Sequence, residues 1–298
     1  MRIDRHPNNP LIVPHMDARM GANINGPSLL KVPDWLPRPL GRYYLYFAHH
    51  QGTYIRLAYA DDLGGPWRMH EPGTLHLEQT PMHGHIASPD IHIDAAERRI
   101  RMYYHGPHAS GGQKSGVAFS ADGLNFTAEP VAYAKPYLRV FRYRETWYGL
   151  AMCRDSRADA DPRGGRWYRS RDGIVFDEEG PRAPLEYMRH TAVLRDGDTL
   201  TVCWSQVFQS PEHILATRIR LGPDWNVWSA EGETISLIRP EFDWEGVDCP
   251  HEPSKYGWAP ERVWQLRDPG LYREGDATWI FYSVAGEHGL ALARVHGL

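Results

Sequence analysis

Charged, imidazole and amide side chains recur at comparable places along this chain, next to short runs of strand-forming residues. Where a first run begins, the polar residues are Asn23, Asn25, Ser88, Asp90, Arg139, Arg189, His190, Arg267 and Asp268. Where a second run ends, they are His49, His50, His105, Arg154, Gln206 and Glu287. Carboxyl and imidazole groups can transfer protons near neutral pH, and guanidinium groups can bind anions. Packing alone does not explain this recurrence, although some of these groups could pair with each other.

The elements that would position these residues are short β-strands. In residues 87–107, polar and apolar residues alternate from Asp90 to Asp94, a polar turn follows, and a β-prone run from Arg99 to His105 ends in Gly-Pro. This pattern predicts two strands joined by a turn. It recurs along the chain in five units of four strands, spaced roughly 50–75 residues apart, with no helical stretch of note.

Five such units predict an all-β fold, a five-bladed β-propeller with four-stranded antiparallel blades in a single domain over residues 1–298. Two turns, at 120–126 and 170–176, share the pattern Ser-x-Asp-Gly-x-x-Phe, and Asp-Gly is a strong turn signal. The fifth unit shows three clear strands, so we expect the N-terminal segment Leu11-Ile12-Val13 to supply its outer strand and close the ring. A β-sandwich would also fit the strand count, because counting strands does not fix closure.

Ring closure would bring the two polar sets together. In a propeller blade, the first strand starts at the same end of the central channel at which the second strand finishes. Residues 240–258 lie between units four and five and are rich in carboxylates and aromatics. Long loops of this kind usually bind ligands, so Glu245, Asp248 and Glu252 join the candidates.

Composition narrows the function classes. The chain of 298 residues has a formal net charge of −4, which gives no basic field for nucleic acid or an acidic membrane surface. Its three cysteines do not form the framework of a disulfide-rich protein. The sequence shows no apolar signal segment, so we expect a cytoplasmic protein. Neither a Gly-rich phosphate loop nor a Gly-x-Ser-x-Gly motif occurs.

Three features resemble a known group of enzymes. Ser88-Pro89-Asp90-Ile91, Arg267-Asp268-Pro269 and the Asp-Gly hairpins resemble the five-bladed propeller glycoside hydrolases of families 43 and 32, and the resemblance in blade pattern covers essentially the whole chain. It implies a saccharide substrate whose glycosidic bond is cleaved between one protonated and one ionised carboxyl group.

The chain departs from the family 43 pattern at three places. Where that pattern has acidic residues in blades one, three and four, this chain has Asn25-Gly26-Pro27, Leu138-Arg139 and Arg189-His190. The usual triad is therefore not carried over. The catalytic candidates are Asp90, Asp268, Glu245 and Glu252, with His105, or alternatively His190, as an imidazole acid. The substrate-binding candidates are Asn25, His49, His85, Arg139, Arg189, His190, Asp248 and Arg267.

We therefore expect a glycosidase acting on a small saccharide. Three arginines on one face favour an anionic sugar, or phosphate, which would make the protein a glycoside phosphorylase. The same arginines and histidines would suit a lyase, and the missing triad would suit a sugar-binding propeller without catalysis. His83-Gly-His85 is a weak metal signal, so we expect no cofactor, although a Ca²⁺ ion could occupy the channel.

Overall fold

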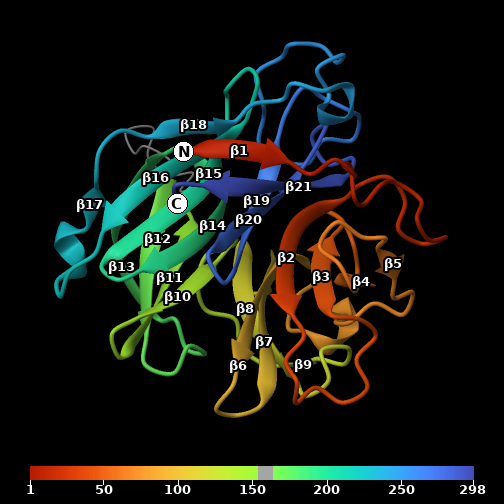
Figure 1. Ribbon diagram of the computed structural model, residues 1–298. Coiled ribbons are helices and arrows are strands. Elements are labelled where there is room, and N and C mark those ends of the chain that lie inside the picture. Colours follow the sequence, from red (N-terminus) through yellow and green to blue (C-terminus); the bar gives the residue numbers. More distant parts are fainter. Residues whose placement is uncertain (154–163) are drawn as a thin grey trace.

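The computed structural model describes residues 1–153 and 164–298, which form five antiparallel sheets arranged as the blades of a propeller (Figure 1). Blade one contains β2 (Asn25–Lys31), β3 (Tyr43–Ala48), β4 (Arg56–Ala60) and β5 (Arg68–Met69). Blade two contains β6 (Ala87–Asp94), β7 (Arg99–Pro107), β8 (Gln113–Ser120) and β9 (Thr127–Ala128). Blade three contains β10 (Arg139–Tyr143), β11 (Thr146–Met152), β12 (Gly164–Ser170) and β13 (Glu178–Glu186).

Blades four and five complete the ring. Blade four contains β14 (Met188–Asp196), β15 (Thr199–Gln206), β16 (Ile214–Arg220) and β17 (Ser229–Ala230), and β18 (Ile235–Ile238) also pairs with β16. Blade five contains β19 (Arg267–Glu274), β20 (Ala277–Ser283), β21 (Leu290–His296) and β1 (Arg2–Arg5). Three short 3₁₀ helices are η1 (Leu77–Gln79), η2 (Trp225–Val227) and η3 (Asp243–Glu245). Among the described residues, no helix has the length and apolar character that crossing a membrane requires.

The two ends of the chain close the ring together. β1 pairs with β21 from Arg2 opposite His296 to Arg5 opposite Ala293, which places both termini on blade five (Figure 1). The prediction that the N-terminal segment closes the last blade is confirmed, but the predicted strand at Leu11–Val13 is wrong. Ile12 forms only an isolated bridge with Leu290 and is fully buried in the core between blades five and one.

The repeated turn motif forms the same structure twice, between the third and fourth strands of blades two and three. Asp122 Oδ1 accepts hydrogen bonds from the backbone N–H groups of Leu124 and Asn125, both at 2.8 Å. Asp172 Oδ1 does the same for the two residues after its glycine, at 2.8 and 3.0 Å. The glycines that follow each aspartate have φ values of 73° and 71°, which explains why the motif requires glycine there.

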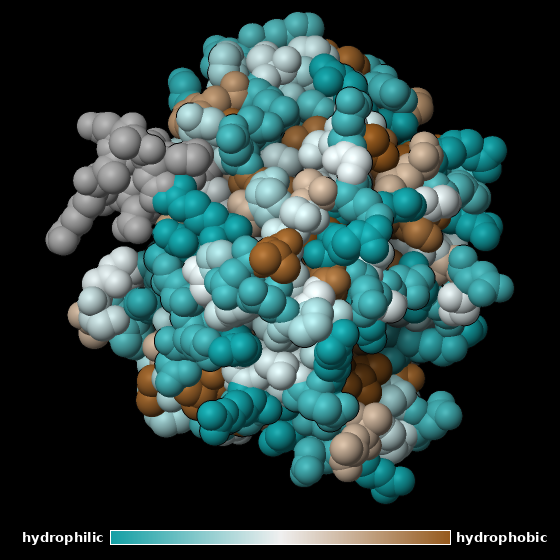
Figure 2. All heavy atoms as spheres, turned by 90° about the vertical axis from the view of Figure 1, so that its left-hand side faces the viewer, coloured by the Kyte–Doolittle hydropathy of each residue, from teal (hydrophilic) through white to brown (hydrophobic). Residues whose placement is uncertain are grey.

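The cores lie between neighbouring blades. The core between blades three and four contains Trp167, Trp204 and Trp228, and the core between blades one and two contains Tyr44 and Tyr46. Figure 2 shows that the side of the molecule carrying β17 is mainly hydrophilic, with scattered hydrophobic residues. Scattered surface hydrophobics are normal for a folded domain, so that face gives no sign of a large apolar contact surface.

The innermost strands begin with an unusual backbone conformation in all five blades. Gly26, Ser88, Tyr137, Tyr187 and Asp268 lie at or next to these starts, with φ values of 63°, 50°, 59°, 55° and 47°. In blades one, two and five, a proline follows and the pairing register shifts by a bulge. A side chain other than glycine costs about 1–3 kcal/mol in such a conformation, so the surrounding structure must hold these residues in place.

The starts of first strands and the ends of second strands do meet, as predicted. Asn25 is opposite Ala48 in blade one, and Ala87 is opposite His105 in blade two. Met188 is opposite Gln206 in blade four, and Arg267 is opposite Ser283 in blade five. The polar residues at these places therefore gather at one end of the ring.

Candidate functional site

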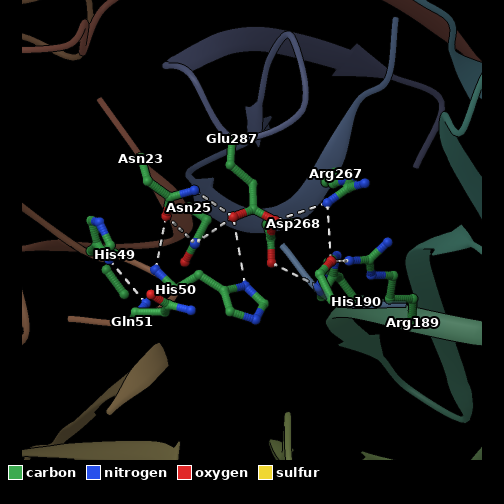
Figure 3. A network of polar contacts seen from close by, with 12 residues as sticks. Asn23, Asn25, His49, His50, Gln51, Arg189, His190, Arg267, Asp268 and Glu287 are labelled. Atoms are coloured by element: carbon green, nitrogen blue, oxygen red, sulfur yellow. Dashed lines mark hydrogen bonds and ion pairs between the residues drawn. The ribbon is translucent and has the colours of Figure 1, made fainter. Parts of the chain in front are cut away.

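A network of buried polar side chains occupies the end of the ring at which the innermost strands begin (Figure 3). At its centre is Glu287, fully buried in the loop between β20 and β21. Its Oε2 accepts hydrogen bonds from the amide groups of Asn23 at 2.7 Å and Asn25 at 3.2 Å. Nη1 of Arg267 lies 2.8 Å from Oε1, and Nδ1 of His50 lies 3.6 Å from Oε2. Blades one and five thus share one carboxylate.

A second buried carboxylate, Glu212, holds the neighbouring side of the network. Nη1 of Arg189 lies 3.1 Å from its Oε2, and Nε of Arg267 lies 3.6 Å from the same atom. The hydroxyl group of Ser205 donates to its Oε1 at 2.7 Å. These charges are buried but paired, which is the condition under which a buried ion is tolerated.

Asp268 lies beside Glu287 in this network, in the strained position at the start of β19 (Figure 3). Its Oδ1 is 3.4 Å from Nε2 of His190, and both side chains are almost inaccessible to solvent. Burial and the negative charge of Glu287 raise the pKa of Asp268 to about 7, although Arg189 and Arg267 act against this. The carboxyl group therefore keeps its proton almost to neutral pH.

Glu287 behaves in the opposite way. Burial alone would raise its pKa, but the hydrogen bond with His50 and the charge of Arg267 outweigh burial and hold the pKa of Glu287 well below its usual value. Two neighbouring carboxyl groups are thus kept in different states, one protonated and one ionised. Environments that separate the pKa values of two acids in this way are characteristic of acid–base sites.

Two neutral imidazoles and a tyrosine form the wall next to Asp268. The ring of Tyr137 lies 4.1 Å from that of His105 and 4.9 Å from that of His190, measured between ring centroids. Burial lowers the pKa of both histidines well below the usual value, with His85 and Arg189 adding to the effect on His105 and His190 respectively. Within the described part of the chain, Nδ1 of each has no hydrogen-bond partner.

A cleft of about 340 Å³ opens beside the network and is formed mainly by residues 250–263. Arg267 and Gln265 lie at the inner end of its lining. The loop is held by buried guanidinium groups, because Arg189 donates to the carbonyl oxygens of Lys255, at 2.9 Å, and of Gly257. The irregular segment between units four and five therefore borders the buried acids.

A larger cleft, of about 540 Å³, lies at the opposite end of blade three. It contains three carboxylates, but Asp172 is used by its turn and Glu178 pairs with Arg169. It includes none of the residues predicted for the site. We therefore place the candidate site at the network and the 340 Å³ cleft, where buried acids have perturbed pKa values.

The predicted acids make different contacts. Asp268 is in the network, but Asp90 links blades two and three: its Oδ2 lies 2.9 Å from Nε2 of His92 and accepts the backbone N–H of Val140 at 2.9 Å. Burial would raise the pKa of Asp90, but His92 and Arg139 lower it below the usual value. Asp90 is thus an ionised carboxylate that joins blades two and three. The carboxyl group that raises the pKa of Asp268 is Glu287.

The three loop acids also differ in position. Glu245 is fully buried and is not among the residues that line the cleft; its Oε1 lies 2.8 Å from Nε of Arg5 and accepts from the hydroxyl of Tyr282 at 2.9 Å. It joins the loop to β1 and β20. Asp248 is exposed and pairs with Arg262 at 3.0 Å. Glu252 is the one of the three that lines the 340 Å³ cleft.

The predicted arginines are all occupied by internal contacts. Besides the bonds given above for Arg189 and Arg267, Arg139 donates from Nε to the carbonyl of Thr191 at 2.8 Å and from Nη1 to that of Ser88 at 3.0 Å. Arg139 thereby connects blades two, three and four. The expectation of an anion held by these three guanidinium groups finds no support in their geometry, since an anion would have to replace carboxylates and carbonyls.

The remaining predicted residues lie around the network. Asn25 is part of it, and His49 is half-buried with its ring 6.5 Å from that of Trp258 on the cleft. The ring centroid of His85 lies 6.2 Å from that of His50, and burial together with the charge of His50 lowers the pKa of His85 to about 4. Arg154, the strand-two end of blade three, lies outside the described residues.

Three important members of the site were not predicted as functional: Glu287, Glu212 and Tyr137. Glu287 stands at a strand-two end, so its position was identified, but nothing in the sequence shows that it lies beside Asp268. Glu212 and Tyr137 stand in connections between strands and carry no motif. The described residues contain no group of three or more His, Cys, Asp and Glu side chains arranged to hold a metal ion.

Comparison with known proteins places the chain among relatives. No family model matches it. An uncharacterized protein of Acanthamoeba polyphaga mimivirus is 35% identical over 308 residues, covering 92% of this chain and 83% of the viral protein. The chain belongs to the same family as this viral protein. Membership in that family brings no activity with it, because the relative is itself uncharacterized.

Solved structures show what fold this family has. A glycoside hydrolase family 43 enzyme from Xanthomonas citri matches with a TM-score of 0.63 at 15% identity, covering 93% of this chain and 88% of the enzyme. An α-L-arabinofuranosidase from Lactobacillus brevis matches with a TM-score of 0.63 at 12% identity, covering 96% and 92%. The chain therefore has the five-bladed propeller fold of these enzymes, in a form that has diverged far in sequence.

Proposed function

We propose that the protein is a glycosidase that cleaves a small saccharide at the network end of the ring. Asp268 donates a proton to the leaving glycosidic oxygen, and Glu287 is the ionised carboxylate that stabilises the positive charge developing on the sugar ring. A water molecule completes the reaction by adding its hydroxyl group to the sugar carbon, and the proton that it releases restores the protonated form of Asp268. His190 holds the Asp268 carboxyl group in position.

One observation carries this proposal: the pKa values of two neighbouring buried carboxyl groups are driven in opposite directions. The fold adds support, since the Xanthomonas citri enzyme is known in complexes with xylose and xylotriose. These are ligands of that enzyme, and they make short pentose saccharides the first substrates to try here.

The test is release of reducing sugar or nitrophenol from a panel of oligosaccharides and aryl glycosides, including xylosides and arabinofuranosides. We expect turnover by the unaltered chain and a loss of about 10²–10⁴-fold in Asp268→Asn, the range that general acid catalysis contributes. Glu145→Gln, which changes an exposed carboxylate on the β10–β11 turn, is the matched control. Equal rates in Asp268→Asn and the control would refute the role of Asp268.

A second candidate, sugar binding without turnover, is favoured by one observation in blade one. Gly26 occupies the place that corresponds to Asp268 in blade five, and a Cβ atom there would lie 2.9 Å from Cα of Ser88. A carboxylate therefore cannot stand at this position without movement of the backbone. Saccharide binding that is measurable by calorimetry, with no cleavage of any panel member, would support this second candidate.

A further inference from the structure

The 340 Å³ cleft has the features of a binding site for one unit of a saccharide. Its volume falls within the range of about 300–1,000 Å³ typical of small-molecule sites. Arg267 lines the cleft and also bonds to Glu287, so this one side chain connects a ligand in the cleft with the buried acids. We propose that this cleft binds a neutral sugar unit, with Trp258 as the surface on which the sugar ring stacks. This proposal rests on the proposed function, because it names the substrate class of the same site.

The loop that carries Trp258 is held in place by hydrogen bonds to buried side chains. Gly257, its neighbour in sequence, accepts from Arg189 and from Nη1 of Arg267, the latter at 3.4 Å. At the start of the loop, buried Ser254 accepts from the backbone N–H of Phe208 at 2.9 Å. Because the stacking surface is already held in place, ligand binding does not have to pay the entropic cost of ordering this loop.

Trp258 itself is placed as a stacking surface requires. It lines the cleft, and 38% of the residue is exposed, although tryptophan is usually well buried. On one side it faces the half-buried ring of His49. An indole offers a wide apolar face for the C–H face of a sugar, while neighbouring polar groups can bond to the hydroxyls.

The charges on the lining favour a neutral ligand over an anionic one. Glu252 and Glu261 contribute carboxylates, whereas the guanidinium groups of Arg262 and Arg267 are engaged by carboxylates outside the cleft. Lys255 adds one exposed cation, and solvent screens it and the two exposed carboxylates alike, so two negative charges stand against one positive charge. Carboxylates can accept hydrogen bonds from sugar hydroxyls but repel a uronate or a phosphate, so the cleft selects against anionic saccharides.

The experiment measures binding separately from cleavage. An array of neutral and uronate-containing oligosaccharides, xylotriose among them, is incubated with the Asp268→Asn chain alone and with Trp258→Ala or Trp258→Phe added to it. We expect neutral members to bind, Trp258→Ala to weaken binding about tenfold, and Trp258→Phe to retain most of it. Phe242→Ala removes an aromatic side chain of similar exposure outside the cleft and should leave binding unchanged.

Each outcome decides the proposal. Preferential binding of uronates, equal binding by the Trp258→Ala and Phe242→Ala chains, or no binding to any array member would overturn it. Binding that depends on Trp258, without cleavage by the unaltered chain, would support the cleft and refute the glycosidase. Cleavage with the same KM in Trp258→Ala and the unaltered chain would support the glycosidase and refute the cleft.

Discussion

Replacing Asp268 by asparagine should change how stability depends on pH, whatever the protein catalyses. The pKa of this carboxyl group is about 7 in the folded chain, against 3.8 for an ordinary aspartate. Below pH 3.8 the group is protonated in both the folded and unfolded states. Between pH 3.8 and 7 the unfolded chain releases the proton and the folded chain keeps it, so the free energy of unfolding falls as the pH rises.

The size of the effect follows from the two pKa values. Each pKa unit corresponds to about 1.4 kcal/mol, so the interval between 3.8 and 7 amounts to about 4 kcal/mol. The unaltered chain should lose this amount of stability from Asp268 between pH 4 and pH 7. Asparagine does not titrate, so the stability of Asp268→Asn relative to the unaltered chain should rise by about 4 kcal/mol over the same interval.

The assay is urea unfolding of both chains at intervals from pH 4 to pH 8. Asp90→Asn is an informative control, because the pKa of Asp90 is lowered below 3.8 and this carboxyl group is ionised in both the folded and the unfolded chain above that pH. The stability of Asp90→Asn relative to the unaltered chain should therefore stay nearly constant from pH 4 to pH 8. A difference between Asp268→Asn and the unaltered chain that stays constant from pH 4 to pH 7 would refute the reasoning about the buried pair.

Two further predictions concern the neighbouring strand and the neighbouring acid. Gly26→Ala should lower the free energy of unfolding by more than Gly197→Ala, since both have positive φ, yet only at Gly26 would the new Cβ meet backbone, at 2.9 Å. Thermal unfolding checks this, and equal losses would contradict it. Glu287→Gln should lower the pKa of Asp268 by about 1–3 pH units, measured by carbon NMR titration, whereas Glu245→Gln, an equally buried change, should leave it near 7.

The sequence predicted the blades well because their signals are local. Each Ser-x-Asp-Gly-x-x-Phe turn is built by contacts within seven residues, so its structure follows from its own sequence. The closing strand was misplaced for the opposite reason. Arg2–Arg5 has one apolar residue and forms an exposed edge, whereas Leu11 and Ile12 are apolar because they are buried in the core, and burial alone does not distinguish a strand.

The site was predicted in part. A proline at the start of the first strand recurs in three blades and helped to identify Asp268, because the bulged start is a local feature. The partner of Asp268 depends on tertiary structure, since Glu287 reaches it from another loop of the same blade. Glu245 was a candidate because its segment is rich in carboxylates, but its side chain bonds to Arg5, 240 positions away in the chain.

The perturbed acids depend on closure of the ring. Asn23 and Asn25 come from blade one and bond to Glu287 of blade five, and these two blades meet where the ring closes, next to the blade in which β1 pairs with β21. The bonds to Glu287 keep it ionised, and its charge in turn raises the pKa of Asp268. The proton on Asp268 is therefore a property of the closed propeller, which explains why the aspartate could be read from the sequence while its protonation state could not.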